Sequence, residues 1–224
     1  MFRVLRNGLI LLFLLRPMIC LGKSPDHIRS LAVSPDGKII AVDFETGGVS
    51  FIYKIPVDTG NATRLTDAKM GKESSPAFSP HGKRIAFSYS PGNGAHSSIV
   101  IGNADGSDSR PWSPSESNDF SPVFSPDNKS IVFSRSGFYG SYSPIAQPHP
   151  HAWSFYASDL DGTNVRELTS ESFYMASPAS VSLDGKHMVI VQEGFNTSRE
   201  IAIYSLGSPR KADPVTAASC SQRS

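Results

Sequence analysis

A five-residue motif that occurs four times along the chain places the strongest limit on its fold. The copies begin at Ser34, Ser79, Ser125 and Ser182, so successive copies lie 45, 46 and 57 residues apart. They read Ser-Pro-Asp-Gly-Lys, Ser-Pro-His-Gly-Lys, Ser-Pro-Asp-Asn-Lys and Ser-Leu-Asp-Gly-Lys. Regular spacing of this size is typical of a repeat protein and not of a single enzyme core.

Each copy of the motif lies between two short apolar runs, for example 31–33 and 40–42 in the first repeat. The Gly or Asn near its centre supplies the positive φ that a tight hairpin turn requires, so the motif predicts a turn between two strands. A third apolar run follows in every repeat, and three repeats add a second turn and a short fourth run. Four strands in about 45 residues predict the blade of a β-propeller, an all-β fold. The expected antiparallel blades are at about 28–66, 74–113, 120–169 and 176–206.

The order of these features resembles the propeller repeat of TolB-type periplasmic proteins. The resemblance rests on Ser-Pro-Asp-Gly-Lys, two apolar strands, Asp-Gly and then Arg-x-Leu-Thr, over about residues 28–206. The departures are His81, Asn128 and Leu183, which a tight turn tolerates. TolB-type propellers usually have six blades, so four repeats imply either an incomplete, open propeller of that type or an unusual closed ring of four. We expect the open form.

The N-terminal residues differ from everything that follows. Residues 1–22 combine a basic leader, a short apolar run and small residues before a cleavage point after Gly22, which predicts a secretory signal peptide and a periplasmic or secreted protein. A retained membrane anchor and a lipid anchor on Cys20 are the alternatives. After cleavage only Cys220 would remain, so we expect no intrachain disulfide. We also expect that the cleaved chain has no membrane span.

The mature chain would be close to neutral. Removing residues 1–22 takes away three arginines and no acidic residue, which leaves 18 Lys and Arg against 20 Asp and Glu. This balance lacks the basic stripe of a nucleic-acid surface, so we expect no nucleic-acid partner. The propeller is expected over 23–207, and the polar segment 208–224 is expected to be an unstructured tail.

The third repeat carries about eleven extra residues between its second and third strands, within 136–151. This insertion is either a disordered surface loop or a loop that anchors a partner through its exposed aromatic residues. In blade geometry it lies on the same face as the connections into each innermost strand, and we expect the binding surface there and not on the face of the Asp-Gly turns. The candidate partner-binding residues are Glu73, Asp119, Phe120, Arg135, Phe138, Tyr139, Tyr142, Trp153, Phe173, Tyr174 and Arg199.

Catalytic and metal-binding patterns are weak in this sequence. There is no Gly-x-Ser-x-Gly motif for a serine hydrolase, the pair His149 and His151 has no third ligand nearby in sequence, and Asp159-x-Asp161 matches the turns of the other repeats better than a calcium loop. We therefore expect no catalytic residue, cofactor or metal. The resemblance implies an exported, non-catalytic module that binds proteins of the cell envelope or extracellular proteins. The alternative is the propeller portion of a larger hydrolase, such as a prolyl-oligopeptidase-type serine peptidase.

Overall fold

The structure is a computed structural model, and it describes residues 27–66, 71–92, 96–114, 116–140, 149–169, 173–176, 178–193, 200–206 and 215–217. Every regular element in these residues is a β-strand. The strands form four blades, numbered here 1 to 4 in chain order. Blade 1 contains β1 (His27–Val33), β2 (Ile39–Thr46), β3 (Val49–Pro56) and β4 (Thr63–Arg64), and blade 2 contains β5 (Gly71–Phe78), β6 (Arg84–Pro91), β7 (Ser98–Asn103) and β8 (Arg110–Pro111). Blade 3 contains β9 (Asp119–Phe124), β10 (Ser130–Gly140), β11 (His149–Asp159) and β12 (Arg166–Glu167), and blade 4 contains β13 (Met175–Ala176), β14 (Ser180–Val181), β15 (His187–Glu193), β16 (Glu200–Ser205) and β17 (Val215–Ala217).

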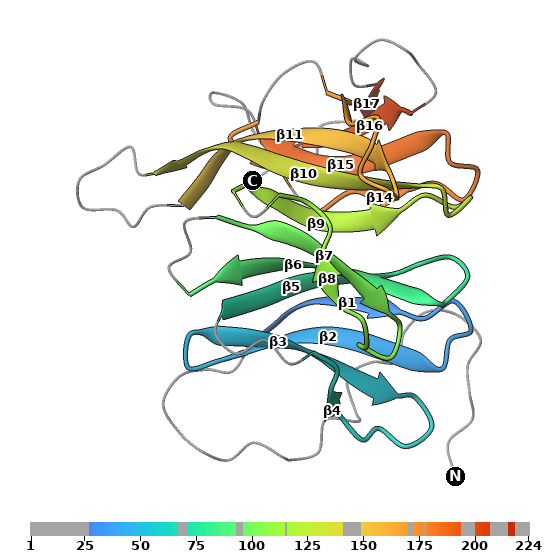
Figure 1. The fold of residues 1–224 in the computed structure, drawn as a ribbon. Coiled ribbons are helices and arrows are strands. Elements are labelled where there is room, and N and C mark those ends of the chain that lie inside the picture. The colour runs from blue at the N-terminus through green and yellow to red at the C-terminus, as the bar shows by residue number, and fades with distance from the viewer. Residues whose placement is uncertain are drawn as a thin grey trace, which may run out of the picture.

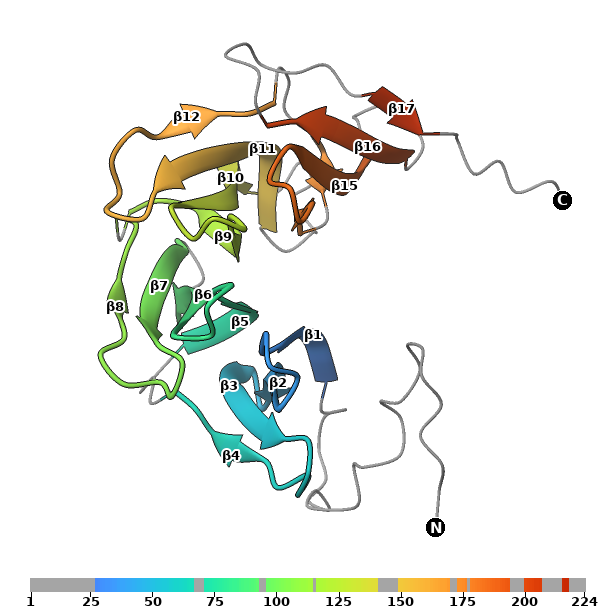
Figure 2. The same ribbon diagram turned by 90° about the vertical axis from the view of Figure 1, so that its right-hand side faces the viewer.

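The blades follow one another along an open arc. In Figure 1 they lie as successive layers, from blade 1 in blue to blade 4 in orange and red. Figure 2 looks onto the open arc, with β1, β5 and β9 on the inner side and the short strands β4, β8 and β12 on the outer rim. All strand pairs within a blade are antiparallel. The all-β propeller predicted from the repeats is therefore confirmed.

The apolar core lies between the blades and not within them. Successive side chains of a strand point to opposite faces of its sheet, so one strand contributes to two cores. In β6, Ile85 and Phe87 pack with residues of blade 1, whereas Ala86 between them packs with residues of blade 3. The consequence is that each blade is apolar on both faces, as the runs flanking the motif indicated.

The innermost strands share a bulge that links neighbouring blades. Ser75 in β5 and Ser121 in β9 have φ values of 54° and 52°, and the strand register shifts at both residues. The backbone N–H of Ser75 donates to Asp43 Oδ2 in blade 1 at 3.3 Å, and that of Ser121 donates to Ser88 Oγ in blade 2 at 2.8 Å. These buried acceptors satisfy the N–H groups that the bulge removes from the ladder.

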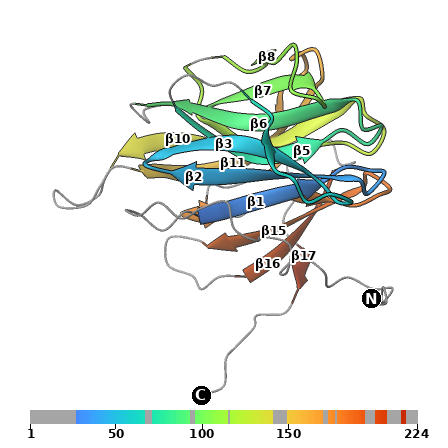
Figure 3. The ribbon, with the colours of Figure 1, turned by 90° about the horizontal axis from the view of Figure 1, so that it is seen from below.

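Two expectations need correction. Much of the insertion in the third repeat is regular structure, because β10 and β11 pair from Ser130↔Asp159 to Gly140↔His149, and this long hairpin extends past the strands of the neighbouring blades (Figures 1 and 3). The expected tail at 208–224 contains β17, which pairs with Ile201–Ile203 of β16 and supplies the fourth strand of the last blade. The predicted signal peptide, 1–22, lies outside the described residues.

Candidate functional site

The repeated motif forms hairpin turns whose residues serve one another. In blade 1, Ser34 Oγ donates to Asp36 Oδ1 at 2.6 Å and accepts from the backbone N–H of Ile39 at 2.9 Å, while the N–H of Lys38 donates to Asp36 Oδ1 at 3.1 Å. The turns of blades 3 and 4 repeat these three bonds. The residue before Lys has φ between 57° and 71° in all four turns, which explains the Gly or Asn at that position.

These bonds also set the charge state of the turn aspartates. The serine hydroxyl, followed by the backbone N–H of the lysine, lowers the pKa of Asp36, Asp127 and Asp184 below the ordinary carboxyl value. Thr163 does the same to Asp161 and Ser107 to Asp105 in the second turns. The aspartates are therefore ionised at neutral pH, and their carboxylates accept the hydrogen bonds that close the turns.

Both sets of turns lie on one face, which we call the turn face. The carbonyl oxygen of the motif lysine accepts a bond from the start of the second turn in its own blade, as in Ala104 N to Lys83 O at 3.0 Å. The motif proline contributes differently, because Pro35 of blade 1 lies over Gly82 of blade 2, where an added Cβ would be 3.6 Å from the proline ring. The same relation joins Pro126 to Gly185. The serine, aspartate and glycine of the motif thus act within the turn, and Pro35 and Pro126 contact the next blade.

The opposite face, which we call the insertion face, brings together several of the predicted binding residues. Asp119 and Arg135 are paired in register on β9 and β10, and the carboxylate of Asp119 accepts from Arg135 Nε at 2.6 Å and from Arg135 Nη2 at 3.0 Å. Asp119 is fully buried, whereas Arg135 is half-buried and its guanidinium lies 4.8 Å from the ring centre of Tyr156. Hydrogen bonding to Asp119 raises the pKa of Arg135, against the opposing effect of burial.

Aromatic side chains meet at the same end of blade 3 but on the other side of its sheet, the side that faces blade 4. The rings of Phe120 on β9 and Trp153 on β11 make an edge-to-face contact with 5.1 Å between centres. Trp153 forms a backbone bridge with Phe173, which leads into blade 4, and Tyr174 lies against His151 with 5.5 Å between ring centres. Phe120, Trp153 and Tyr174 are partly exposed and Phe173 is buried. Sequence reasoning placed these four aromatics on one face, and the structure gathers them there.

The remaining predicted residues are placed differently. Glu73 occupies the position in blade 2 that Asp119 occupies in blade 3, but its buried carboxylate accepts bonds from Ile52 N at 3.1 Å and from Thr66 Oγ1, both of blade 1. It therefore ties two blades together and does not face solvent. The backbones of Phe138 and Tyr139 belong to the far end of the β10–β11 hairpin. Tyr142 and Arg199 lie outside the described residues.

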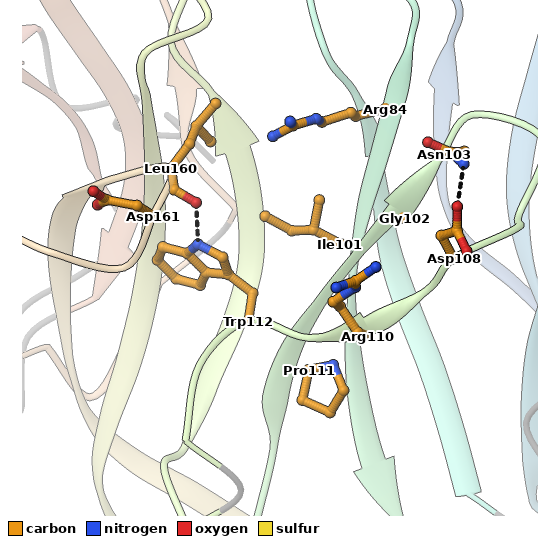
Figure 4. A pocket seen from close by; sticks show the side chains of 10 residues that line it. All are labelled: Arg84, Ile101, Gly102, Asn103, Asp108, Arg110, Pro111, Trp112, Leu160 and Asp161. Atoms are coloured by element: carbon orange, nitrogen blue, oxygen red, sulfur yellow. Dashed lines mark hydrogen bonds between the residues drawn. The ribbon is translucent and has the colours of Figure 1, made fainter.

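The turn face carries a hollow that sequence reasoning missed. It has a volume of about 490 Å³ and lies between the outer strands of blade 2 and the second turn of blade 3. Figure 4 shows Arg84 and Arg110 on either side of Ile101, with Asp108 and Asp161 at the two ends. Trp112 Nε1 donates to Leu160 O at 2.9 Å and closes one wall. Two arginines and two aspartates balance in charge, so the lining favours neither anions nor cations. The signal available in the sequence was Arg-Pro-Trp at the fourth strand, where repeats 1 and 3 have Leu65 and Leu168 in place of Trp112.

Within the described residues, no group of three or more His, Cys, Asp or Glu is arranged to hold a metal ion. The same residues contain no helix long and apolar enough to cross a membrane. Among the described residues of the insertion face, the aromatic rings of Phe120 and Trp153 and the Arg135 guanidinium are partly exposed, and both residue types are enriched in binding surfaces.

Comparison with known proteins agrees with this geometry. The Tol-Pal system protein TolB of Francisella tularensis is 36% identical over 85 residues, a match that covers 38% of this chain and 19% of that protein. Dipeptidyl-peptidase 5 of Porphyromonas endodontalis is 32% identical over 78 residues, covering 31% of this chain and 11% of that protein. A crystal structure of TolB from Acinetobacter baumannii superimposes with a TM-score of 0.65 at 25% identity, over 85% of this chain and 44% of that one.

Each of these matches spans less than half of the protein to which the chain is compared. The family model described as the TolB beta propeller domain, in contrast, matches residues 18–211, which is most of the chain. The repeated turns, the blades and this match together show that the chain belongs to the TolB β-propeller domain family.

Proposed function

We propose that the protein is an exported, non-catalytic interaction module that binds proteins of the cell envelope through its insertion face. The observation that carries the proposal is the group of partly exposed aromatics around Phe120 and Trp153, which lies at the base of a hairpin longer than any other in the described structure. The Asp119–Arg135 pair lies at the same end of the blade, on the other side of the sheet. Aromatic residues and arginine are the residue types enriched in protein interfaces.

The geometry assigns separate roles to the candidate residues. Asp119 and Glu73 are buried, so they position the inner strands and do not touch a partner directly. Arg135 keeps part of its guanidinium exposed while Asp119 fixes its orientation, which lowers the entropy cost of using it in recognition. Apolar contact area comes from Phe120, Trp153 and Tyr174. We propose that the binding surface also includes Phe138, Tyr139, Tyr142 and Arg199.

The Tol-Pal relative supports the choice of partner class. That relative is named as a component of the Tol-Pal system, and the chain shares its propeller repeat. We therefore place this protein in the periplasm, exported by a signal peptide that ends at Gly22. Sequencing the N-terminus of the chain recovered from a periplasmic fraction tests the location, since a start at Lys23 is expected and an uncleaved chain in the membrane fraction contradicts it.

A pull-down from envelope extract tests the binding surface. The parent chain is compared with a Tyr139→Ala/Tyr142→Ala variant on the hairpin and with a Lys38→Ala/Lys83→Ala variant on the turn face. We expect the hairpin variant to lose the captured protein and the lysine variant to keep it, with both variants unfolding at the parent's denaturant midpoint. Loss with the lysine variant alone would move the site to the turn face and end this proposal.

A second function has its own support. The dipeptidyl-peptidase relative shares 78 residues with this chain at 32% identity, which fits a propeller that belongs to a larger serine hydrolase. The two functions differ in what the gene encodes after Ser224. A reading frame that continues into a domain with Gly-x-Ser-x-Gly favours the hydrolase, whereas a frame that closes without one favours the interaction module.

A further inference from the structure

Equivalent positions in successive blades show what each blade contributes to its neighbours. We call the side of a blade that faces the next blade its forward face and the other side its rear face. Ala41, Ala86 and Val132 occupy the same position on the forward faces of blades 1, 2 and 3, and each is buried in the core shared with the following blade. The equivalent residue of blade 4 is Val189, which is 37% exposed, against 2% for Val132.

The third strands give the same result. Ile52, Ile99 and Phe155 are equivalent and fully buried, whereas their counterpart in blade 4, Ile201, is 45% exposed. On the rear faces the inner-strand residues Phe78, Phe124 and Val181 pack into the three cores, but their counterpart in blade 1, Val33, is 51% exposed. Both end blades thus carry surfaces built for burial in an inter-blade core.

The two end faces also match each other in their polar groups. Inside the arc, Asp43 and Ser88 accept a bond from the bulged serine of the following blade. Blade 4 has Val191 at this position, and the valine side chain cannot accept a hydrogen bond. The bulged serine of blade 1, Ser30, needs no such acceptor, because its N–H donates to Asp43 of its own blade at 2.8 Å. The bulged serine of blade 2 or blade 3 would lose its acceptor if that blade packed against Val191. Blade 1 would lose no such bond, because the N–H of Ser30 already donates to Asp43.

The turns provide a second point of complementarity. Pro35 and Pro126 each cover the turn glycine of the following blade. At this position blade 4 has Leu183, which is 96% exposed. The corresponding glycine of blade 1, Gly37, has nothing within 4 Å of an added Cβ, so it is open to receive such a side chain.

We propose that the forward face of blade 4 binds the rear face of blade 1 in a second copy of this chain. The contact buries Val189 and Ile201 against Leu31 and Val33, and it places Leu183 over the partner's Gly37. In one chain these faces lie at opposite ends of the arc (Figure 2) and are exposed, so they do not cover each other. The contact is heterologous, and repeated contacts of this kind give rings or open assemblies.

Sedimentation velocity of the chain from Lys23 to Ser224, the mature form proposed above, tests this over a wide concentration range. The parent is expected to associate as concentration rises. Val189→Glu on the forward face and Leu31→Glu on the rear face should each weaken association by at least about 100-fold, because each buries an unpaired charge. Val165→Glu, at an exposed valine of blade 3 away from both faces, should behave as the parent. All four proteins begin at Lys23, so the apolar segment 1–22 takes no part in the association that is measured.

Mixing the two end-face variants separates head-to-tail contact from other modes. The Val189→Glu chain keeps its rear face and the Leu31→Glu chain keeps its forward face, so an equimolar mixture should form a 1:1 dimer and stop there. Formation of that dimer also shows that both variants fold. A parent that stays monomeric, a single variant that still associates, or a mixture that stays monomeric overturns the proposal. The outcome is independent of the proposed function, which concerns the insertion face.

Discussion

Arg135 holds the fully buried carboxylate of Asp119 through two hydrogen bonds, at 2.6 and 3.0 Å, and does so from the neighbouring strand of the same blade. The pair joins β9 to β10 at the point where the long hairpin leaves the body of the blade. It therefore fixes the base of the hairpin that the proposed binding surface uses.

Removing the guanidinium tests this relationship. Arg135→Ala leaves the Asp119 carboxylate buried without its charged partner, and we expect a loss of about 3 kcal/mol in the free energy of unfolding. Arg135→Lys should recover part of the loss, because an ammonium group keeps the charge but not the two-pronged geometry. Arg84→Ala, at an exposed arginine of the turn face, is the control. A loss no larger than that of the control would contradict the role given to the pair.

The inter-blade cores make a separate prediction. Phe87 and Phe133 occupy equivalent positions in blades 2 and 3, and they are 2% and 1% exposed. Replacing either with Ala should lower the free energy of unfolding by about 3–5 kcal/mol, the usual range for a buried aromatic. Val57→Ala, at an exposed valine, should change it little. Urea titrations in which both phenylalanine variants keep the parent's midpoint would show that the core is wrongly assigned.

The second turn motif offers a gain of stability that depends on pH. Blade 2 has His81 where the other turns have an aspartate that accepts bonds from Ser and Lys. His81→Asp should stabilise the fold at neutral pH, because the carboxylate can accept the same bonds. By analogy with Asp36, the new carboxyl should have a lowered pKa in the fold. Its contribution is then full above the unfolded value of about 3.8 and disappears as pH falls through the lower folded value.

His81→Asn is the matched control for this prediction. The amide has nearly the same shape as the carboxylate and can accept similar bonds, but it does not titrate in this range. Thermal unfolding of the two variants at pH 7 and at pH 3 compares them directly. An aspartate variant whose advantage over the His81→Asn variant is the same at both pH values would show that the charge has no part in the turn.

The short outer strands depend on a hydroxyl group. Ser113 Oγ accepts from the N–H of the fully buried Ile99 at 2.8 Å, and Thr66 and Thr169 hold the same position in blades 1 and 3. Ser113→Ala should cost about 1–3 kcal/mol, because that N–H loses its acceptor, and should speed hydrogen exchange of the Ile99 amide. Ser117→Ala, which removes a less buried hydroxyl nearby, is expected to leave that exchange rate unchanged.

The sequence predicted the parts of the fold that depend on local chemistry. The turns at Ser34 and Ser125 follow from residues within five positions of one another, so the motif alone indicates them. β17 was missed because its three residues gain strand structure from pairing with β16, and nothing in their own pattern indicates a strand. The insertion was read as a loop because its glycine and proline content hides the alternation of β10 and β11.

The candidate site was predictable to a similar extent. Blade geometry placed Phe120, Trp153 and Tyr174 on one face, because the distance of each residue from the nearest turn motif tells at which end of its strand it lies. The pairing of Asp119 with Arg135 depends on the register shift at the β9 bulge, which no local pattern indicates. The burial of Glu73 depends on contacts with Ile52 and Thr66 in another blade, so a carboxylate expected at the surface became a link between blades.

Because every core is shared between two blades, a blade by itself has no interior. We call the packed interface between two blades a joint. The stability of the arc should then grow with the number of joints more than with the number of blades, as in other repeat proteins. The described blades have three such joints. Loss of an end blade removes one joint and uncovers the next, so unfolding should proceed inward from blades 1 and 4. A contact between the two end faces adds a joint without adding a residue, which makes assembly itself a source of stability.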